Sequence, residues 1–216
     1  VLLGKSGEGK TTLFRIIAGI EDQDEGKVII DSTKTTMVFQ DNQLYPHLNV
    51  FNNLMTPQRV ILKRTKKEAT IISDDILKRL NIEYLKYNTV ESLSGGEAQR
   101  VAIARALAMD KDIILFDEPT SALDRENINI LIGLLKDLKK DKTVLIITHD
   151  EEFSIGVADT IYRIENGEIN KTIETCVGVW NALSELDADR KSLMINLGGG
   201  VVTDLGAFVA STFKRG

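Results

Sequence analysis

The 216-residue sequence lacks several features that mark particular classes of protein. It has a single cysteine, Cys176, which excludes an internal disulfide and suits a reducing compartment. It has no run of about eighteen apolar residues, so we expect no segment to span a membrane by itself. It also has no excess of basic residues. The formal net charge is −5, which argues against non-specific binding to nucleic acid.

The sequence contains no internal repeat or low-complexity tract, and we expect no signal peptide because the chain opens directly on an apolar segment and a glycine loop. It begins at Val1 rather than at methionine, and we therefore expect the natural N-terminus to be missing. What is present is ordinary for a globular protein. Hydrophobic residues make up 43% and charged residues 27% of the chain, which is enough apolar material for a core.

The first motif is a glycine-rich loop directly after the apolar start of the chain. Residues 4–11 match the pattern G-x-x-x-x-G-K-S/T in the order strand, loop, helix. Backbone N–H groups in such a loop point into one concavity, and the following helix adds its positive end. We expect Lys10 to contact the β- and γ-phosphates of ATP and the Thr11 hydroxyl to hold Mg²⁺. The residues expected to contact the nucleotide are Gly4, Ser6, Gly7, Gly9, Lys10, Thr11 and Thr12.

Gly7 and Gly9 have a specific expected purpose, because a Cβ at either position would keep the backbone away from the phosphates. The alternative is a glycine-rich turn that only happens to precede a helix. Four further motifs in the same chain argue against that alternative.

Alternating helical and apolar segments predict an α/β protein with a parallel sheet. Residues 66–80 carry apolar side chains near a 3.6-residue period, within a more basic helical subdomain expected at about residues 48–108. A hairpin that turns at Asn166 and Gly167 is expected near residue 165. The other expected helices are 11–18, 95–108 and 125–139, and the expected strands are 27–30, 36–39, 113–116 and 143–147.

Two carboxylates, Asp117 and Glu118, follow the apolar run 113–116. In a parallel sheet the end of such a strand lies at the carboxyl edge, beside the phosphate loop. We expect Asp117 to hold Mg²⁺, directly or through water, and Glu118 to polarise the water that attacks the γ-phosphate. An acidic turn would be the better interpretation of an isolated pair, but the phosphate loop favours the catalytic one.

Residues 93–97, with the sequence LSGGE, predict a helix start. Ser94 stands at the N-cap position and Glu97 three residues later, which is a capping-box arrangement. Gly95 and Gly96 weaken a first turn, so we expect them to expose N–H groups to an anion. This segment resembles the LSGGQ-type signature of the ATP-binding cassette (ABC) ATPases. The resemblance covers about residues 1–171, and we expect the nucleotide-binding domain at residues 1–172.

The resemblance implies roles for further residues. Gln40 matches the glutamine that senses Mg²⁺ and couples to a transmembrane partner, and His149 matches the switch histidine that contacts the γ-phosphate. By itself, a lone histidine after a strand is more often structural. Asp124 lies in the loop 121–124 that crosses to a second subunit in this family. The family dimerises head to tail, which implies that Ser94, Gly95, Gly96 and Glu97 of one subunit cap the ATP bound by the other.

Residues 37–60 look most like the importers of polar amino acids. The resemblance implies an ATPase that uses ATP and Mg²⁺ at the cytoplasmic face of the cell membrane. Its partners would be a second ATPase subunit and a transmembrane permease, with no nucleic acid and no direct contact with the transported solute. The aromatic residue and antiparallel strands that precede the phosphate loop in the family have no counterpart here, so we expect weakened ATP affinity.

Two alternatives to this function stay open. One is a non-transport cassette ATPase that acts on nucleic acid or ribosomes, and the other is an inactive chimeric fragment. Residues 174–216 resemble 3-dehydroquinate synthase, through the sequence WNAL at 180–183, the glycines 198–200, Asp204 and Arg215. Neither zinc ligands nor a second domain follow, so we expect a partial segment at 173–216 without synthase activity, and a plain glycine turn at 198–200. A truncated fusion and an assembly artefact are both compatible with the join.

Overall fold

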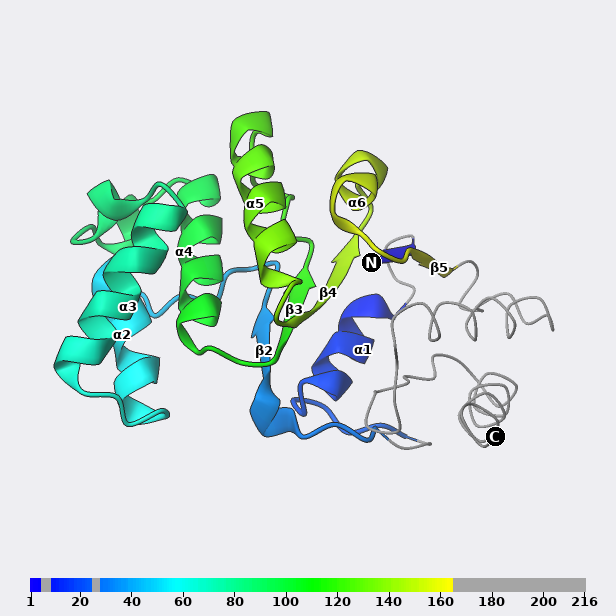
Figure 1. Ribbon diagram of the computed structural model, residues 1–216, viewed down its shortest axis with the longest axis horizontal. Coiled ribbons are helices and arrows are strands. Elements are labelled where there is room, and N and C mark those ends of the chain that lie inside the picture. The colour runs from blue at the N-terminus through cyan, green and yellow to red at the C-terminus, as the bar shows by residue number, and fades with distance from the viewer. Residues whose placement is uncertain (5–8, 25–27, 165–216) are drawn as a thin grey trace.

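The computed structural model describes residues 1–4, 9–24 and 28–164 (Figure 1). They form a five-stranded sheet in the order β2-β3-β4-β1-β5, in which all the neighbouring strands are parallel. The strands are β1 (Leu2–Gly4), β2 (Thr35–Val38), β3 (Ile113–Asp117), β4 (Thr143–Thr148) and β5 (Tyr162–Ile164). The predicted α/β class and parallel sheet are therefore confirmed.

Six α-helices and three short 3₁₀ helices lie in the described ranges. The predicted helices at 11–18, 66–80, 95–108 and 125–139 are all present with ends that differ by a residue or less. The α-helices are α1 (Lys10–Ile17), α2 (Val50–Val60), α3 (Lys66–Arg79), α4 (Gly95–Ala108), α5 (Arg125–Leu138) and α6 (Glu151–Val157). The 3₁₀ helices are η1 (Ser32–Lys34), η2 (Glu83–Leu85) and η3 (Val90–Ser92).

Helices cover both faces of the sheet, which explains the continuous apolar runs of its inner strands, residues 113–116 and 144–147. Leu115 of β3 faces α1, in a core cluster with Phe14 and Ile17. Its neighbour Phe116 faces the other way, in the larger cluster with α4, α5 and α6. Figure 1 shows α1 on one side of the strands and α5 and α6 on the other. Burial on both faces fixes the strands and thereby the loops at their ends.

The helices α2, α3 and α4 pack together beside the sheet (Figure 1). Leu54 and Leu77 are fully buried between them. The Thr65 side chain caps α3 and accepts from the backbone N–H of Glu68, whose carboxylate accepts from the Thr65 N–H in return. These three helices belong to the same core as β2 and β3, because α4 packs on β2.

One predicted strand is wrong, and one predicted turn lies outside the described residues. The predicted strand 27–30 is wrong over residues 28–30, which have no regular structure; Lys27 lies outside the described ranges. Ile29 is 82% exposed there, so its apolar run finds no neighbouring strand to pack on. β5 forms near the expected position, but it pairs in parallel with β1. The predicted turn at Asn166 and Gly167 lies outside the described residues.

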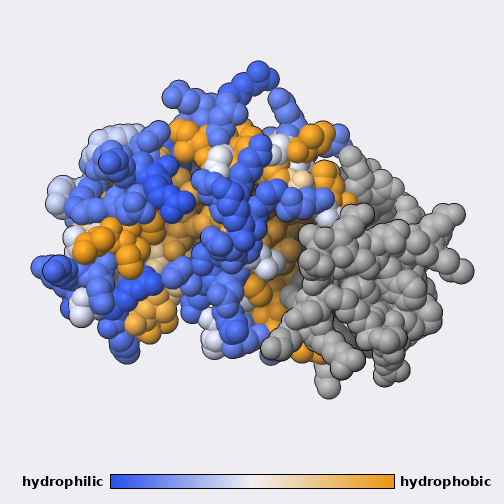
Figure 2. All heavy atoms as spheres, viewed as in Figure 1, coloured by the Kyte–Doolittle hydropathy of each residue, from blue (hydrophilic) through white to orange (hydrophobic). Residues whose placement is uncertain are grey.

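On the face shown in Figure 2, the described residues are largely hydrophilic, with apolar residues in several groups between them. Across the part of the chain that the structure describes, no helix combines the length and apolarity required to cross a lipid bilayer.

Candidate functional site

The carboxyl ends of three adjacent strands meet at one edge of the sheet. Gly4 ends β1, Asp117 ends β3 and Thr148 ends β4. The register places Asp117 opposite Ile147 and Thr148 opposite Leu3. The residues that follow these strands therefore emerge side by side, where ligands bind in open parallel sheets. This is the arrangement that the sequence predicts.

Lys10 is anchored at the first of these strand ends. It begins α1, is only 7% exposed, and its Nζ donates to the Gly4 carbonyl at 2.8 Å. The ammonium group is thus held at the base of the loop that joins β1 to α1. Residues 5–8 of that loop lie outside the described ranges, and so do the predictions for Ser6 and Gly7.

Gly9 sits at the N-cap of α1 with a left-handed backbone, φ 76°. Residues other than glycine rarely adopt this backbone conformation, so the conformation alone favours glycine at this position. A Cβ at Gly9 would meet no atom within 4 Å among the described residues. Gly9 has no side chain to cap the helix, and the N–H groups of a first turn are suited to binding an anion. Thr12 lies exposed in this first turn.

Asp117 has the chemistry of a magnesium ligand. Its side chain is buried at 2% exposure, and its Oδ1 has no hydrogen-bond partner among the described residues. Burial raises the pKa of the Asp117 carboxyl, and its hydrogen bond with Thr11 opposes that rise. A buried carboxylate with a free oxygen beside a hydroxyl is an unfavourable arrangement by itself. It fits Mg²⁺, which takes hard oxygen ligands.

Glu118 and His149 face each other across neighbouring strand ends. His149 Nδ1 lies 2.9 Å from Glu118 Oε2, and the two side chains are 73% and 13% exposed. The contact has the distance of an ion pair, although Oε2 makes no hydrogen bond of good geometry within the described structure. Glu118 has a left-handed backbone, φ 49°, and its N–H donates to the Ile147 carbonyl at 2.9 Å. A non-glycine residue in this conformation marks a locally strained position, which is common at active sites.

Gln40 lies near the same edge of the sheet. It follows β2 by two residues, and β2 pairs with β3 in a register that places Val38 opposite Phe116. Its side chain is exposed. The structure therefore places Gln40 at the strand end next to Asp117, as the resemblance implies.

The predicted capping box at the start of α4 is present. The Ser94 Oγ accepts from the Glu97 N–H, and Glu97 Oε2 accepts from the Ser94 N–H at 2.8 Å. The Tyr84 hydroxyl also donates to Glu97 Oε1 at 3.0 Å. The Ser94 backbone hydrogen bond is the main reason why the pKa of the Glu97 carboxyl lies below its ordinary value. Glu97 thus caps the helix, and no local sequence pattern indicates its contact with Tyr84.

The loop after β3 packs on the start of α4. A Cβ on Gly96 would lie 2.9 Å from the Ala122 carbonyl oxygen, whereas a Cβ on Gly95 would lie 3.7 Å from the Ala122 Cβ. The close approach of Ala122 therefore favours glycine at position 96. No local sequence pattern indicates this contact. In the same loop, Asp124 caps α5 by accepting from the Asn127 N–H at 2.9 Å.

An open parallel sheet whose first strand leads through a glycine loop to a helix with a buried lysine, beside an Asp-Glu pair, defines a P-loop nucleotide-binding protein. The comparisons identify the family. The family model described as ABC transporter matches residues 1–121. The chain belongs to the ABC transporter family.

Relatives agree with this assignment. The chain is 36% identical to the glutamate/aspartate import ATP-binding protein GltL of Escherichia coli (strain K12), over 78% of this chain and 76% of that one. It is 39% identical to the glutamine transport ATP-binding protein GlnQ of Geobacillus stearothermophilus, with the same coverage. Among solved structures, the dimeric bacterial ABC transporter cassette MJ0796 matches with a TM-score of 0.72 and 33% identity, over 78% of this chain and 82% of that chain.

A second family model, 3-dehydroquinate synthase N-terminal, matches residues 161–216. It agrees with the resemblance of residues 174–216 and begins earlier in the chain. Residues 162–164 of this match form β5, which pairs with β1 in the sheet described above. The predictions for residues 173–216 lie outside the described residues.

Proposed function

We propose that this chain is the ATP-hydrolysing subunit of an importer of polar amino acids, with its cassette at residues 1–172. The observation that carries the proposal is the meeting of Lys10, Asp117, Glu118 and His149 at one edge of the sheet. The solute class is supported by the names of relatives, which transport glutamate, aspartate or glutamine. The subunit would work at the cytoplasmic face of the membrane, bound to a permease.

Each of these residues has a distinct role in the proposed reaction. Lys10 and the N–H groups at the start of α1 bind the phosphates. Thr11 and Asp117 would hold Mg²⁺, with Gln40 nearby, and the ion would neutralise charge on the β- and γ-phosphates. Glu118 polarises the attacking water, and His149, at 2.9 Å, orients the Glu118 carboxylate and contacts the γ-phosphate. The proton from water passes to Glu118 as the γ-phosphoryl group leaves ADP.

The start of α4 completes the site in a head-to-tail dimer. In this proposal Ser94, Gly95 and Gly96 of one subunit contact the ATP bound by the other, while Glu97 holds the cap that orients them. Asp124 would contact the second subunit from the loop 121–124. The dimeric structure of the related cassette MJ0796 supports this arrangement, and a second solved form of that cassette contains ADP and Pi.

The test is Glu118→Gln, which keeps the size of the side chain but removes its basicity. Phosphate release should fall by at least about 100-fold, because general-base catalysis is lost. ATP should still produce a dimer, which light scattering would detect. Glu126→Gln in the first turn of α5 is the matched control and should turn over ATP normally. Unchanged phosphate release by the Glu118 variant would remove this residue from the mechanism.

A further inference from the structure

The loop that follows Gln40 has an unusual backbone. Asn42 and Gln43 both have positive φ angles, 60° and 44°, although neither is glycine. The turn is tightened by two hydrogen bonds, from the Asn42 N–H to the Phe39 carbonyl at 3.1 Å and from the Gln43 N–H to the Asp41 carbonyl at 2.7 Å. Two successive left-handed residues are unfavourable, so the surroundings must hold them in place.

Arg105 of α4 supplies that support. Its Nη1 donates to the Gln43 carbonyl at 2.7 Å and its Nη2 donates to the Asn42 carbonyl at 3.1 Å. The guanidinium carbon lies 5.2 Å from the centre of the Tyr45 ring, within the range of a cation–π contact. Burial lowers the pKa of the Arg105 guanidinium, which shows that the charge is partly withdrawn from water. One planar fork thus fixes both strained residues.

Asn53 of α2 holds the other end of the same loop. Its Oδ1 accepts from the Tyr45 N–H at 2.8 Å, and its Nδ2 donates to the Tyr45 carbonyl at 3.2 Å. The Asn53 side chain is fully buried. The segment between Gln40 and Tyr45 is therefore attached to the helices α2 and α4 by two side chains.

Helix α4 also carries the capped serine, Ser94, at its start. Arg105 lies about three turns further along this helix, roughly 16 Å away. Because α4 is one uninterrupted helix, Arg105 connects the Gln40 loop to the element that begins at Ser94.

We propose that Arg105 is a positioning residue that fixes Gln40 relative to Asp117 and links the Gln40 loop to the start of α4. The inference rests on the role proposed above for Gln40. Arg105 itself touches neither nucleotide nor metal ion. It acts by holding the Asn42 and Gln43 carbonyls.

The first test is Arg105→Lys in the full chain. Lysine keeps the charge but cannot donate a planar fork to two carbonyls. We expect the kcat for ATP to fall by about tenfold while the KM for ATP changes little, because the phosphate loop is untouched. Without nucleotide, amide hydrogen exchange in residues 39–45 should become faster.

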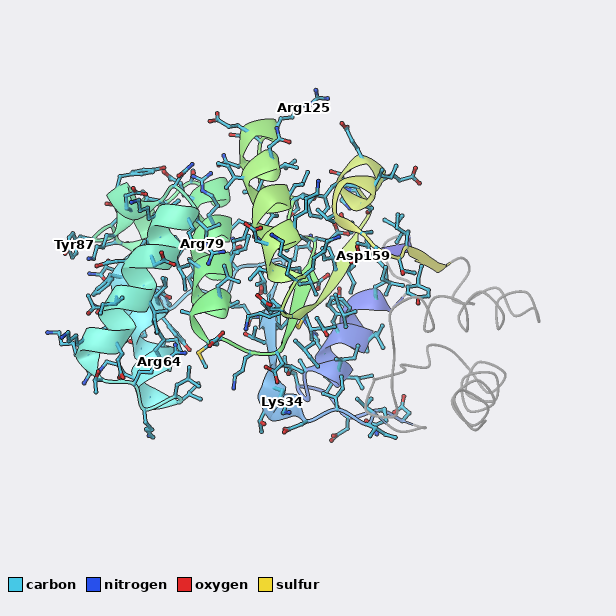
Figure 3. All side chains as sticks on the ribbon, in the orientation of Figure 1. Lys34, Arg64, Arg79, Tyr87, Arg125 and Asp159 are labelled. Atoms are coloured by element: carbon cyan, nitrogen blue, oxygen red, sulfur yellow. The ribbon has the colours of Figure 1, made fainter. Side chains whose placement is uncertain are left out.

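Arg64→Lys is the matched control. Arg64 is another arginine of the helical subdomain (Figure 3). Its Nη1 donates to the Ala108 carbonyl at 2.7 Å and to Gln58 Oε1 at 3.0 Å. It holds the far end of α4 but does not contact the Gln40 loop through these bonds. Its variant should lose thermal stability without losing kcat or changing exchange in residues 39–45. Equal loss of kcat in both variants would reduce Arg105 to a structural residue and overturn the proposal.

A double-mutant cycle separates this inference from the proposed role of Gln40. Gln40→Ala should lower kcat, and adding Arg105→Lys should lower it no further, because Arg105 acts through Gln40. If Gln40→Ala leaves kcat unchanged, the role proposed for Gln40 fails. If the two losses multiply, Gln40 stands and the role of Arg105 fails.

Should Arg105→Lys not fold, Tyr45→Leu decides instead. Tyr45 is 40% exposed, so the substitution is tolerable, and it removes the ring beside the guanidinium. Loss of this contact should lower kcat by about two- to fivefold, with faster exchange in residues 39–45. Wild-type kcat and exchange in this variant would overturn the proposal.

Discussion

His149 and Glu118 approach to 2.9 Å from the ends of two neighbouring strands, β4 and β3. The histidine side chain is largely exposed and the glutamate side chain is largely buried. The two residues lie 31 positions apart in the sequence, so no local sequence pattern predicts their contact. The pairing is a property of the parallel sheet, which brings the two strand ends together.

The first prediction concerns this pair. His149→Ala should lower kcat by about 100-fold and leave the KM for ATP within about twofold, because the substitution leaves Glu118 without orientation but spares the phosphate loop. Phosphate release measured over a range of ATP concentrations separates the two constants. His47→Gln changes the only other histidine and should behave as wild type. A large rise in KM with normal kcat would assign His149 to binding instead.

Replacing Asp117 should stabilise the fold but abolish function. In the nucleotide-free protein, Asp117→Asn should raise the melting temperature by about 2–4 °C, because it replaces a buried carboxyl whose ionised form is disfavoured by burial. The same variant should lose Mg²⁺-dependent ATP turnover. Differential scanning fluorimetry and a magnesium titration of phosphate release measure the two effects. A melting temperature below that of the wild type would show that the carboxylate is stabilised by contacts other than those described.

Two glycines on helices should respond in opposite directions to alanine. Gly96→Ala would bring a Cβ to 2.9 Å from the Ala122 carbonyl oxygen, and the free energy of unfolding should fall by about 1–3 kcal/mol. Gly133 lies exposed within α5, where a Cβ would meet no atom within 4 Å among the described residues. Gly133→Ala should therefore raise the free energy of unfolding by about 0.5–1 kcal/mol. Urea denaturation of both variants is the measurement, and similar shifts in the two would contradict the steric argument.

The capping box of α4 predicts a pH dependence. The pKa of the Glu97 carboxyl lies below its ordinary value of 4.5 in the folded state, so its charge stabilises the fold above that pH. That contribution is lost as the pH falls through the lowered folded pKa. At pH 7, Glu97→Gln should unfold with about 0.5 kcal/mol less free energy than the wild type, a small difference because the carboxylate is partly exposed.

The difference between Glu97→Gln and the wild type should shrink in acid and vanish well below pH 4.5. Denaturation curves at several pH values between neutral and about pH 3 would follow it. Glu126→Gln, which removes a carboxylate with no capping contact among the described residues, is the control for the change in net charge. A gap that stays constant with pH would mean that the charge of Glu97 adds nothing.

The sequence predicted the architecture well because its signals are local. The helix 95–108 follows from Ser94 and Glu97, and the buried strand 113–116 from an unbroken apolar run. The position of Asp117 at the same sheet edge as Gly4 followed from the rule that parallel strands end at one edge. These signals need no knowledge of distant partners.

The parts that sequence did not predict depend on distant partners. Arg105 donates to two carbonyls more than sixty positions earlier in the chain. These acceptors are backbone groups, so the side chains of Asn42 and Gln43 do not indicate the contact. The contact of Tyr84 with Glu97 joins a 3₁₀ helix to α4 through one hydroxyl. The segment around Ile29 was wrongly predicted as a strand from its apolar residues alone. It pairs with no strand among the described residues, and Ile29 is exposed.

The position of β1 in the sheet has a consequence for biosynthesis. β1 lies between β4 and β5, and the Tyr162 N–H donates to the Val1 carbonyl at 2.8 Å. During translation β1 is made before both of the strands that flank it, and these follow more than 140 residues later. β1 can therefore pair with β4 and β5 only after residues 143–164 have been synthesised, so this part of the sheet closes late in biosynthesis.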